Sequence, residues 1–537
     1  MWEHNYTPLA GSLAASALVA ALPVFVLLLL LGALRKPAWL AGVSGLLAAA
    51  LVAVAVYGMP LPLVAQAATF GAAFGLFPIG WIVFWAIVLY RITIITGKFE
   101  VIKDSIGSLT EDRRIQALLI AFSFGAFVEG AAGFGTPVAV AAAMLAGLGF
   151  TPFYAAGICL LANTAPVAFG SIGIPVVTLA AITGLDLNAL SGAVGRICAP
   201  VSLWIPSYLI LVMGGWKGFR AVIPAALACG ASFASVQYLV SNYLGPYLTD
   251  ILSSLAAIGS LVLLLKLWRP SDKFVLEGER PDHPAPKRHP WREVLHAWSP
   301  YYLLVVMVLL WSHPAVKKLL DSASIPIVWP GLHNLVQRLP PLVAQPSPYP
   351  AVYNFNWLSA AGTACLIACV LSVFVLRMPV AQAWEAFRTT ARQLALPLVT
   401  IAAVLGLAFL MNYSGATVTL GLAFGATGVL FPYFSAMLGW LGVFLTGSDT
   451  SSNALFGNLQ VVTANHLGLD PVLMAASNSS GGVMGKMISL QSIAVAAAAT
   501  GMKTSEESRL FRFTLRHSIF LGSMIGLVVV VYAYVWP

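Results

Sequence analysis

Two acids and one lysine stand inside long apolar stretches of the sequence. Glu129 and Asp449 each lie in a polar interruption of an apolar run, and Lys486 lies in another apolar region. A charged side chain in hydrocarbon costs at least ~2.5–3.5 kcal/mol, so such groups are usually paired, protonated or functional. We predict that Glu129 and Asp449 are proton-coupling residues. Lys486 is predicted to hold a substrate carboxylate, or to pair with Asp449 in place of a bound sodium ion.

The interruptions also carry residues that break helices and offer hydrogen bonds. Thr136-Pro137 has the order of a helix N-cap followed by proline. Broken helices persist in hydrocarbon where they line a cavity, and their N-termini favour anions. We therefore expect a small carboxylate to bind between half-helix ends, although hydrogen bonding between helices is the alternative for each polar residue. The candidate substrate-binding residues are Lys486, Asn163, Thr164, Thr136, Ser451, Ser452, Asn453, Asn478, Ser479, Ser480 and Gln491.

The composition indicates the class of protein that positions these residues. Hydrophobic residues make up 59% of the 537 residues and charged residues 9%, against roughly 45–50% and 25% in soluble domains. So few charges argue against a soluble enzyme, a nucleic-acid-binding module and a disordered chain. Several apolar runs reach the roughly 18 residues that cross a bilayer as helix. We predict an all-α polytopic membrane protein with 12–14 transmembrane helices, inverted repeats and broken or re-entrant helices.

The net charge of +9 comes from Lys and Arg residues that gather in short loops between the apolar runs. This pattern predicts that the loops are cytoplasmic and that both termini are extracytoplasmic. The loops lie at 35–36, 91–114, 217–220, 266–292, 377–392 and 503–516. The five cysteines form no CxxC pair, so neither a metal site nor a disulfide framework is indicated, and no cofactor is expected.

We divide the chain into six regions on this basis. They are 1–114 (three helices and a cytoplasmic loop), 115–216 (first inverted repeat with broken helices), 217–266 (connecting helices), 267–297 (cytoplasmic linker), 298–393 (helices and an extracytoplasmic loop at 313–353) and 394–537 (second inverted repeat with broken helices). The helices expected before and after the linker include 67–90 and 298–312. The break at 412–415 is interpreted as a kink or a hairpin tip.

Two distant stretches of the sequence are similar. Residues 148–157 (LGFTPFYAAG) match 467–477 (LGLDPVLMAAS), and each is preceded by one polar break and followed by a second. The charge pattern starts the first copy at the cytoplasmic face and the second at the opposite face. Two copies of opposite orientation form an inverted repeat, which is frequent in secondary transporters.

The motifs around both acids resemble the lactate permease family. The residues that carry the resemblance include 127–139 (FVEGAAGFGTPVA), 163–170 (NTAPVAFG), 447–453 (GSDTSSN) and Gly485-Lys486. The resemblance implies a multi-pass symporter of the bacterial inner membrane that imports L-lactate, and often D-lactate or glycolate, with a proton. It also implies inverted repeats with re-entrant hairpins.

The leading hypothesis is therefore a secondary active transporter that works by alternating access, with a 2-hydroxymonocarboxylate, a proton and the lipid bilayer as its partners, and no nucleic acid. The alternative is a sodium-coupled carrier of another small organic anion. A membrane enzyme or a passive channel is a third hypothesis. The sequence carries no P-loop and no HExxH or GxSxG motif in a suitable setting, which argues against ATP-driven transport and intramembrane hydrolysis. Substrate chirality, stoichiometry and oligomeric state stay open.

Overall fold

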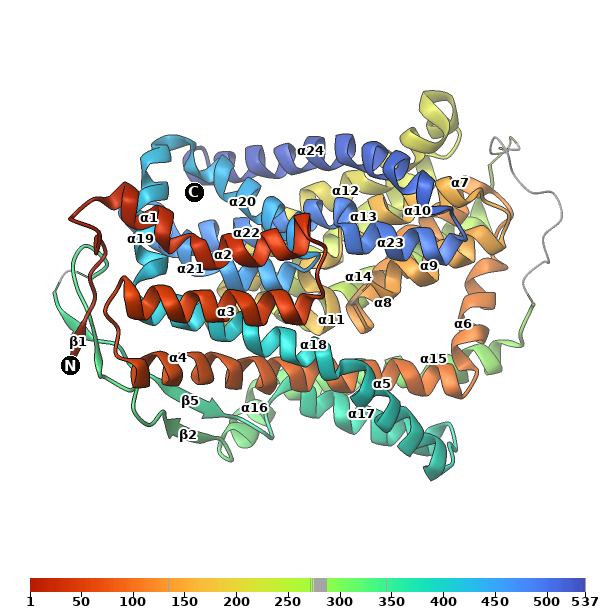
Figure 1. Cartoon of the computed structure of the whole chain (residues 1–537). Coiled ribbons are helices and arrows are strands. Elements are labelled where there is room, and N and C mark those ends of the chain that lie inside the picture. Colours follow the sequence, from red (N-terminus) through yellow and green to blue (C-terminus); the bar gives the residue numbers. More distant parts are fainter. Residues whose placement is uncertain (134, 271, 273, 275–286, 344, 537) are drawn as a thin grey trace.

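The arrangement of the chain is known from a computed structural model, which describes residues 1–133, 135–270, 272, 274, 287–343 and 345–536. Most helices run along one common direction, and the short strands lie at one end together with the N-terminus (Figure 1). Within these ranges, 11 helices are long and apolar enough to cross a membrane, or up to 13 if each bent pair is one span. The predicted all-α polytopic fold is confirmed, and the upper count lies within the predicted 12–14.

The helices and strands have the following bounds. The α-helices are α1 (Leu13–Ala20), α2 (Leu22–Leu28), α3 (Ala38–Ala55), α4 (Leu61–Phe74), α5 (Trp81–Ile95), α6 (Lys98–Gly107), α7 (Arg113–Gln116), α8 (Gly125–Ala131), α9 (Thr136–Gly147), α10 (Pro152–Ala162), α11 (Gly170–Thr183), α12 (Leu187–Arg220), α13 (Ile223–Tyr243), α14 (Thr249–Leu267), α15 (Trp291–Ser312), α16 (Pro314–Asp321), α17 (Ala361–Val375), α18 (Val380–Ser414), α19 (Ala416–Phe424), α20 (Phe431–Thr446), α21 (Asp449–Leu467), α22 (Pro471–Gly485), α23 (Leu490–Thr500) and α24 (Thr504–Tyr534). Short π-helical or 3-10 segments are η1 (Leu29–Ala33), η2 (Gly75–Gly80), η3 (Ala117–Phe124), η4 (Val167–Phe169), η5 (Gly425–Leu430) and η6 (Lys486–Ile488). The strands are β1 (Trp2–Glu3), β2 (Ile325–Val328), β3 (Val336–Arg338), β4 (Ser347–Pro348) and β5 (Val352–Phe355).

The same order of elements occurs twice. In the first copy α8 and α9 form a hairpin, α10 and α11 form a span bent by 65°, and the long helix α12 follows. In the second copy α20 and α21 form the hairpin, α22 and α23 are bent by 42°, and α24 follows. Figure 1 shows that the first hairpin enters from the end where α6 and α7 lie, and the second from the end where α19 lies. This arrangement agrees with the predicted inverted repeat.

The two copies interlock through their broken helices. Helix α11 packs on α21, α12 packs on α22, and α23 packs on both α9 and α10. The hairpin tips and the bends of the paired helices therefore meet inside the protein. Glycines in the left-handed region allow the tight turns, since Gly135 (φ 80°) precedes α9 and Gly447 (φ 73°) separates α20 from α21.

Several element boundaries differ from those expected from the sequence. The single helix expected at 67–90 is α4 and α5, joined by η2, in which Phe77 departs from helical geometry. Helix α15 begins at Trp291, inside the stretch expected as a cytoplasmic linker. The region 313–353, expected as a plain loop, contains α16 and strands of two small sheets. The first turn of α15 carries the charged residues Arg292 and Glu293, which are typical of a loop between apolar runs, so the sequence predicts a later start for this helix.

The break expected at 412–415 is a helix end. Helix α18 begins at Val380 rather than near 394 and continues to Ser414. Gly415 then adopts φ 82°, and α19 starts immediately after it. A left-handed glycine ends a helix without steric cost, and this makes 412–415 a corner between two helices.

Helices α20 and α22 pack so closely that side chains have no room between them. A Cβ atom on Gly481 would lie 1.9 Å from the carbonyl oxygen of Ala436, and one on Gly439 would lie 1.9 Å from that of Asn478. Small residues at such contacts are typical of membrane helix pairs. The second hairpin is therefore held against the bent span by backbone contact.

We expect Gly481→Ala to destabilise the protein, because the added methyl group forces α20 and α22 apart. Overpacking of this kind costs about 1–3 kcal/mol. Thermal unfolding of the detergent-purified protein measures the effect. The matched control is Gly259→Ala on the exposed side of α14, where a Cβ meets nothing within 4 Å. Equal unfolding temperatures for the two variants would contradict the close packing.

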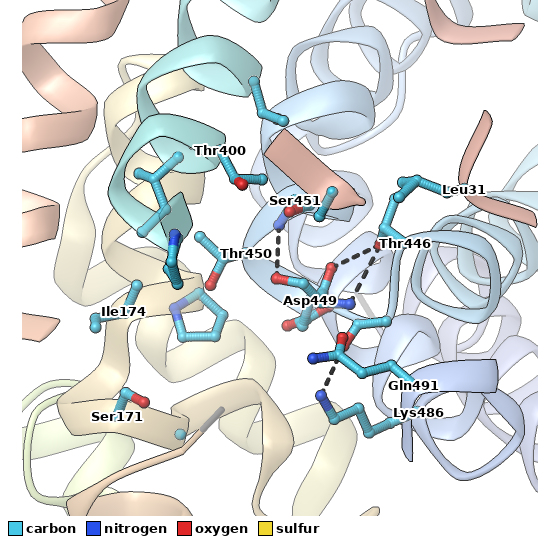
Figure 2. Close-up of a pocket in the computed structure, with 18 of the residues that line it drawn as sticks. Leu31, Ser171, Ile174, Thr400, Thr446, Asp449, Thr450, Ser451, Lys486 and Gln491 are labelled. Atoms are coloured by element: carbon cyan, nitrogen blue, oxygen red, sulfur yellow. Dashed lines mark hydrogen bonds between the residues drawn. The ribbon is translucent and has the colours of Figure 1, made fainter. Parts of the chain in front are cut away.

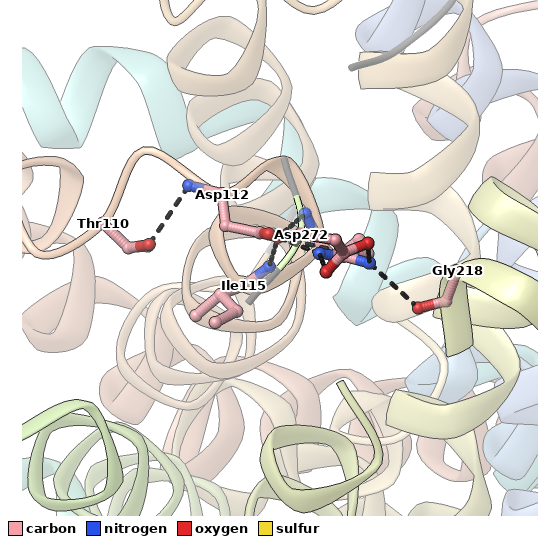
Figure 3. A network of polar contacts seen from close by, with 6 residues as sticks. Thr110, Asp112, Ile115, Gly218 and Asp272 are labelled. Carbon is pink, nitrogen blue, oxygen red and sulfur yellow. Dashed lines mark hydrogen bonds and ion pairs between the residues drawn. The ribbon is translucent and has the colours of Figure 1, made fainter. Parts of the chain in front are cut away.

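The first part of the linker is anchored to the first repeat by a buried arginine. Arg114 donates hydrogen bonds to Asp112 (2.7 Å), to Asp272 (2.8 Å) and to the carbonyl oxygen of Gly218 (3.2 Å), as Figure 3 shows around Asp112. The Arg114 guanidinium also lies 5.0 Å from the centre of the Phe274 ring. Its hydrogen bond and charge lower the pKa of Asp272. Part of the predicted linker, at 271, 273 and 275–286, lies outside the described residues.

The N-terminal segment is anchored at the opposite end. Strand β1 pairs with β3, and the buried His4 ring places one nitrogen 2.9 Å from the Tyr413 carbonyl oxygen and the other 3.1 Å from the Tyr6 hydroxyl. Burial, together with the smaller effect of the positive charge of Arg338, lowers the pKa of His4 to about 4. His4 therefore remains neutral at neutral pH and holds the segment against the end of α18.

Acid is expected to release this N-terminal segment. The folded pKa of about 4 lies below the usual 6.5, so the detached form binds more protons between these values. The attachment is complete above about pH 6.5 and weakens as the pH falls toward 4. Hydrogen–deuterium exchange of peptides covering residues 1–12, corrected for intrinsic rates, measures it. His4→Asn, which cannot be protonated in this range, is expected to remove the pH dependence. If peptides 1–12 of the wild type were equally protected from exchange above about pH 6.5 and near pH 4, the prediction would be contradicted.

Candidate functional site

A cavity of about 270 Å³ lies where the broken segments of both repeats meet helices from the N-terminal part of the chain and α18. Its lining carries two acids, a lysine and several hydroxyl groups together with apolar side chains. Figure 2 shows Asp449, Gln491 and Lys486 close to one another in this lining. The lining residues are Leu27, Leu31, Ala38, Trp39, Glu129, Val167, Gly170, Ser171, Ile174, Pro175, Leu396, Pro397, Thr400, Ile401, Val404, Thr446, Gly447, Ser448, Asp449, Thr450, Ser451, Lys486 and Gln491. Neither repeat alone supplies this set.

Lys486 lies at the bend between α22 and α23, with 8% of its surface exposed. Its ammonium group donates a hydrogen bond of 2.6 Å to the carbonyl oxygen of Gly447, at the tip of the second hairpin (Figure 2). The lysine also interacts electrostatically with both Glu129 and Asp449. One cation therefore interacts with two acids that belong to opposite repeats. The same lysine lines the cavity.

Asp449 is held in place by its position in a helix and by two hydrogen bonds. It is the first residue of α21, where backbone N–H groups and the helix dipole favour negative charge. One carboxylate oxygen accepts hydrogen bonds from Ser479 (2.6 Å) and Asn453 (3.5 Å). A Cβ on Gly482 would lie 2.3 Å from the other oxygen, so glycine is needed there for the acid to fit.

Glu129 has a very different environment. It is 5% exposed, near the end of α8, and its Oε2 atom has no hydrogen-bond partner among the described residues. The side-chain amide of Asn163 also has none. A Cβ on Gly170 would lie 2.6 Å from Oε1 of Glu129. This carboxyl group is confined by close packing, and among the described residues no hydrogen bond holds its Oε2 atom.

A ladder of amide side chains extends from Asp449 along the second repeat. Asn453 bonds the carbonyl oxygen of Pro175 (3.1 Å), Asn478 bonds Asn453 (2.9 Å), and Gln460 bonds Asn478 (3.1 Å). These side chains satisfy one another and do not line the cavity. They stiffen the hairpin that carries Asp449.

The structure brings together only some of the predicted site residues. Glu129, Asp449, Lys486, Ser451 and Gln491 line the cavity. The remaining predicted residues are not in its lining, and these are Thr136, Asn163, Thr164, Ser452, Asn453, Asn478, Ser479 and Ser480.

The local contacts of three of these residues explain their positions outside the lining. Thr136 was expected to be the N-cap of α9, but it is the first helical residue, and Gly135 occupies the N-cap position. Thr164 donates its hydroxyl to the carbonyl oxygen of Leu161, and Ser452 donates to that of Gly439. The acceptor of Thr164 lies three residues earlier in the chain, which is common for such hydroxyls. The acceptor of Ser452 lies on the facing helix of the hairpin, α20.

Sequence reasoning missed part of the cavity lining. Ser171 begins a run of three left-handed residues (φ 47°, 59° and 74°) and donates a hydrogen bond to the carbonyl oxygen of Ala132 in the first hairpin tip. The glycines and proline at 170–175 were a usable signal for this bend. Thr400 is the one hydroxyl in the apolar stretch 394–408 of α18, so the sequence offers no signal for it.

Known proteins are similar to this chain along most of its length. The model of the L-lactate permease family matches residues 16–536. The chain is 45% identical to the glycolate permease GlcA of Escherichia coli (strain K12), covering 100% of this chain and 98% of that protein. It is 47% identical to the L-lactate permease of Bacillus subtilis (strain 168), covering 97% and 96%. The solved structure of MtrF from Neisseria gonorrhoeae aligns with 88% of this chain and 84% of that one, at 13% identity and a TM-score of 0.45.

These matches and the apolar helices confirm the predicted multi-pass transport protein of the bacterial inner membrane. They cover almost every element described above, including both hairpins and both bent spans. The chain belongs to the L-lactate permease family.

Proposed function

We propose that the protein imports L-lactate, with D-lactate and glycolate as related substrates, together with a proton by alternating access. The observation that carries the proposal is the cavity in which Lys486 faces acids from opposite repeats. The names of the relatives, L-lactate permease and glycolate permease, support the choice of substrate.

The cavity suits a small hydroxy acid. Its volume of about 270 Å³ exceeds that of several water molecules at ~30 Å³ each, enough for a three-carbon acid with some water. The Lys486 ammonium would bind the carboxylate, and the hydroxyls of Ser451 and Thr450 would bind the substrate hydroxyl. Ile174 and Pro175 offer an apolar surface for the methyl group of lactate, which glycolate lacks.

Charge balance in the cavity explains the coupling to a proton. In the empty carrier, Lys486 stands between the anions of Asp449 and Glu129. A substrate carboxylate bound to Lys486 would add a further negative charge in a low-dielectric site, where like charges cannot remain ionised side by side. Protonation of Glu129 restores the original charge, so the substrate and one proton are bound together. Asp449, fixed by Ser479 and the α21 N-terminus, stays ionised throughout.

Alternating access would then move one wall of the cavity against the other. One wall consists of α2, α3 and α18, and the other consists of the hairpin tips and bends of the repeats. Carriers built from inverted repeats rock one bundle against the other around a central site. The tight backbone contact between α20 and α22 favours movement of the repeats as rigid units.

Uptake of radiolabelled L-lactate into proteoliposomes tests the proposal. We expect accumulation under an imposed inward proton gradient, abolished by a protonophore, unaffected by sodium and inhibited by glycolate and D-lactate. Strict sodium dependence would instead indicate the sodium-coupled carrier. Equilibration without accumulation against the lactate gradient would indicate a channel.

A further inference from the structure

A third buried acid lies behind Glu129. Asp250 is in the first turn of α14, is 1% exposed, and neither of its carboxylate oxygens has a hydrogen-bond partner among the described residues. A Cβ on Gly130, the neighbour of Glu129, would lie 2.7 Å from the Cβ of Asp250. Helices α8 and α14 therefore touch at this glycine, and Asp250 interacts electrostatically with Glu129. Asp250 does not line the cavity.

Among the residues that the structure describes, those packed around Asp250 carry no positive charge. The elements that pack on α14 are α8, α11, α13 and η3, and none of them carries a lysine or arginine. Their titratable side chains are Glu129, Cys229, Tyr238 and Tyr243, while Cys198 on α12 also interacts with Asp250. Lys486 lies on the side of Glu129 that faces the cavity. Because two neighbouring buried carboxylates cannot both ionise, the acid without a cation is the one that keeps a proton. The α14 N-terminus offsets only part of this preference.

Asp250 is also close to the exposed turn that joins α13 and α14. Tyr243 and Leu244, at the turn between α13 and α14, are exposed, and α14 begins at Thr249. The charge pattern of the sequence predicts that this turn is extracytoplasmic. Asp250 thus stands between the outer surface and Glu129, which faces the cavity.

We propose that Asp250 is a second proton-binding residue of the carrier, which passes its proton to Glu129. This inference rests on the proposed proton symport. In the transfer, the O–H bond of Asp250 breaks as the O–H bond of Glu129 forms. Asp250 regains a proton from water on the outer side, so one proton enters for each transfer. The cavity itself then needs no direct path for protons from that side.

Asp250→Asn tests the relay by two readouts. Infrared spectra of the purified protein at neutral pH are expected to lose one C=O band of a protonated carboxyl group. In proteoliposomes, exchange of external for internal lactate without a pH gradient is expected to stay within about twofold of wild type. The initial rate of proton-driven uptake is expected to fall by about 100-fold, the scale of one proton-transfer group. The control is Asp186→Asn, an exposed acid that caps α12 and whose amide retains the cap.

Three results would overturn the proposal. They are an unchanged carboxyl band, proton-driven uptake equal to wild type, and loss of exchange together with uptake in a folded variant, which is the signature of a structural role. If Asp250→Asn does not fold, Asp250→Ser, which adds no bulk near Gly130, is judged by the same criteria. Wild-type protein that shows no proton-driven accumulation would contradict the proposed function itself, and so the two failures are distinguishable.

Discussion

Replacing Lys486 by methionine is expected to abolish lactate uptake. The substitution removes the cation that would bind the substrate carboxylate, and a hydrogen bond between charged groups contributes about 1.5–3 kcal/mol, or roughly 10- to 150-fold in affinity. It also leaves Glu129 and Asp449 without their shared counter-ion, and an uncompensated buried charge costs about 3–5 kcal/mol. Both effects act in the same direction, so uptake in proteoliposomes should fall below detection, and the thermal stability of the purified protein should fall as well.

Two further variants separate the effects of binding and stability. In the double variant Lys486→Met/Asp449→Asn, one of the two stranded anions is gone, so we expect thermal stability to recover in part while uptake stays absent. Lys266→Met, at the exposed C-terminal end of α14, is the matched control and should transport normally. Normal uptake by Lys486→Met would mean that the carboxylate is held elsewhere, for example by the N-terminus of α21 alone.

The charged residues of the site could be predicted from the sequence because their cost in hydrocarbon is large. Glu129, Asp449 and Lys486 stand out in apolar runs for that reason, and all three line the cavity. Asp250 is equally buried, but it lies close to a polar turn, where an acid is unremarkable. Its proximity to Glu129 arises from the packing of α14 on α8, which leaves no periodic signal in the sequence.

The neutral residues of the site could not be sorted in the same way. Gln491 lines the cavity while Asn478 bonds Asn453 and Gln460, yet both are single amides beside a helix break. The direction of Asn478 depends on the rotation of α22 against α20, which is set by the contacts at Gly439 and Gly481. The direction of Gln491 depends on α23, which begins after the bend. Likewise, the wall that α18 contributes depends on long-range packing.

Glu129→Gln is expected to uncouple transport from the proton gradient. Glutamine has nearly the same shape as the protonated acid and cannot ionise, so the variant mimics the state proposed to bind substrate. Exchange of lactate without a gradient should therefore continue at a rate close to wild type and lose its dependence on pH. Accumulation driven by a proton gradient should fall to the passive level, because no proton is carried.

Asp449→Asn gives the contrast that makes this prediction specific. Asparagine removes the permanent charged partner of Lys486 and replaces the charged acceptor of the 2.6 Å hydrogen bond from Ser479 by a weaker neutral one, so both exchange and accumulation should be lost. If Glu129→Gln still accumulated lactate under a proton gradient, the proton would have to travel by another group. Asp449 would then be the remaining acid in the cavity to carry it. If Asp449→Asn alone kept exchange and lost accumulation, the roles of the two acids would be reversed. The different surroundings of the two acids favour the first assignment, because Asp449 is stabilised as an anion by hydrogen bonds that Glu129 lacks.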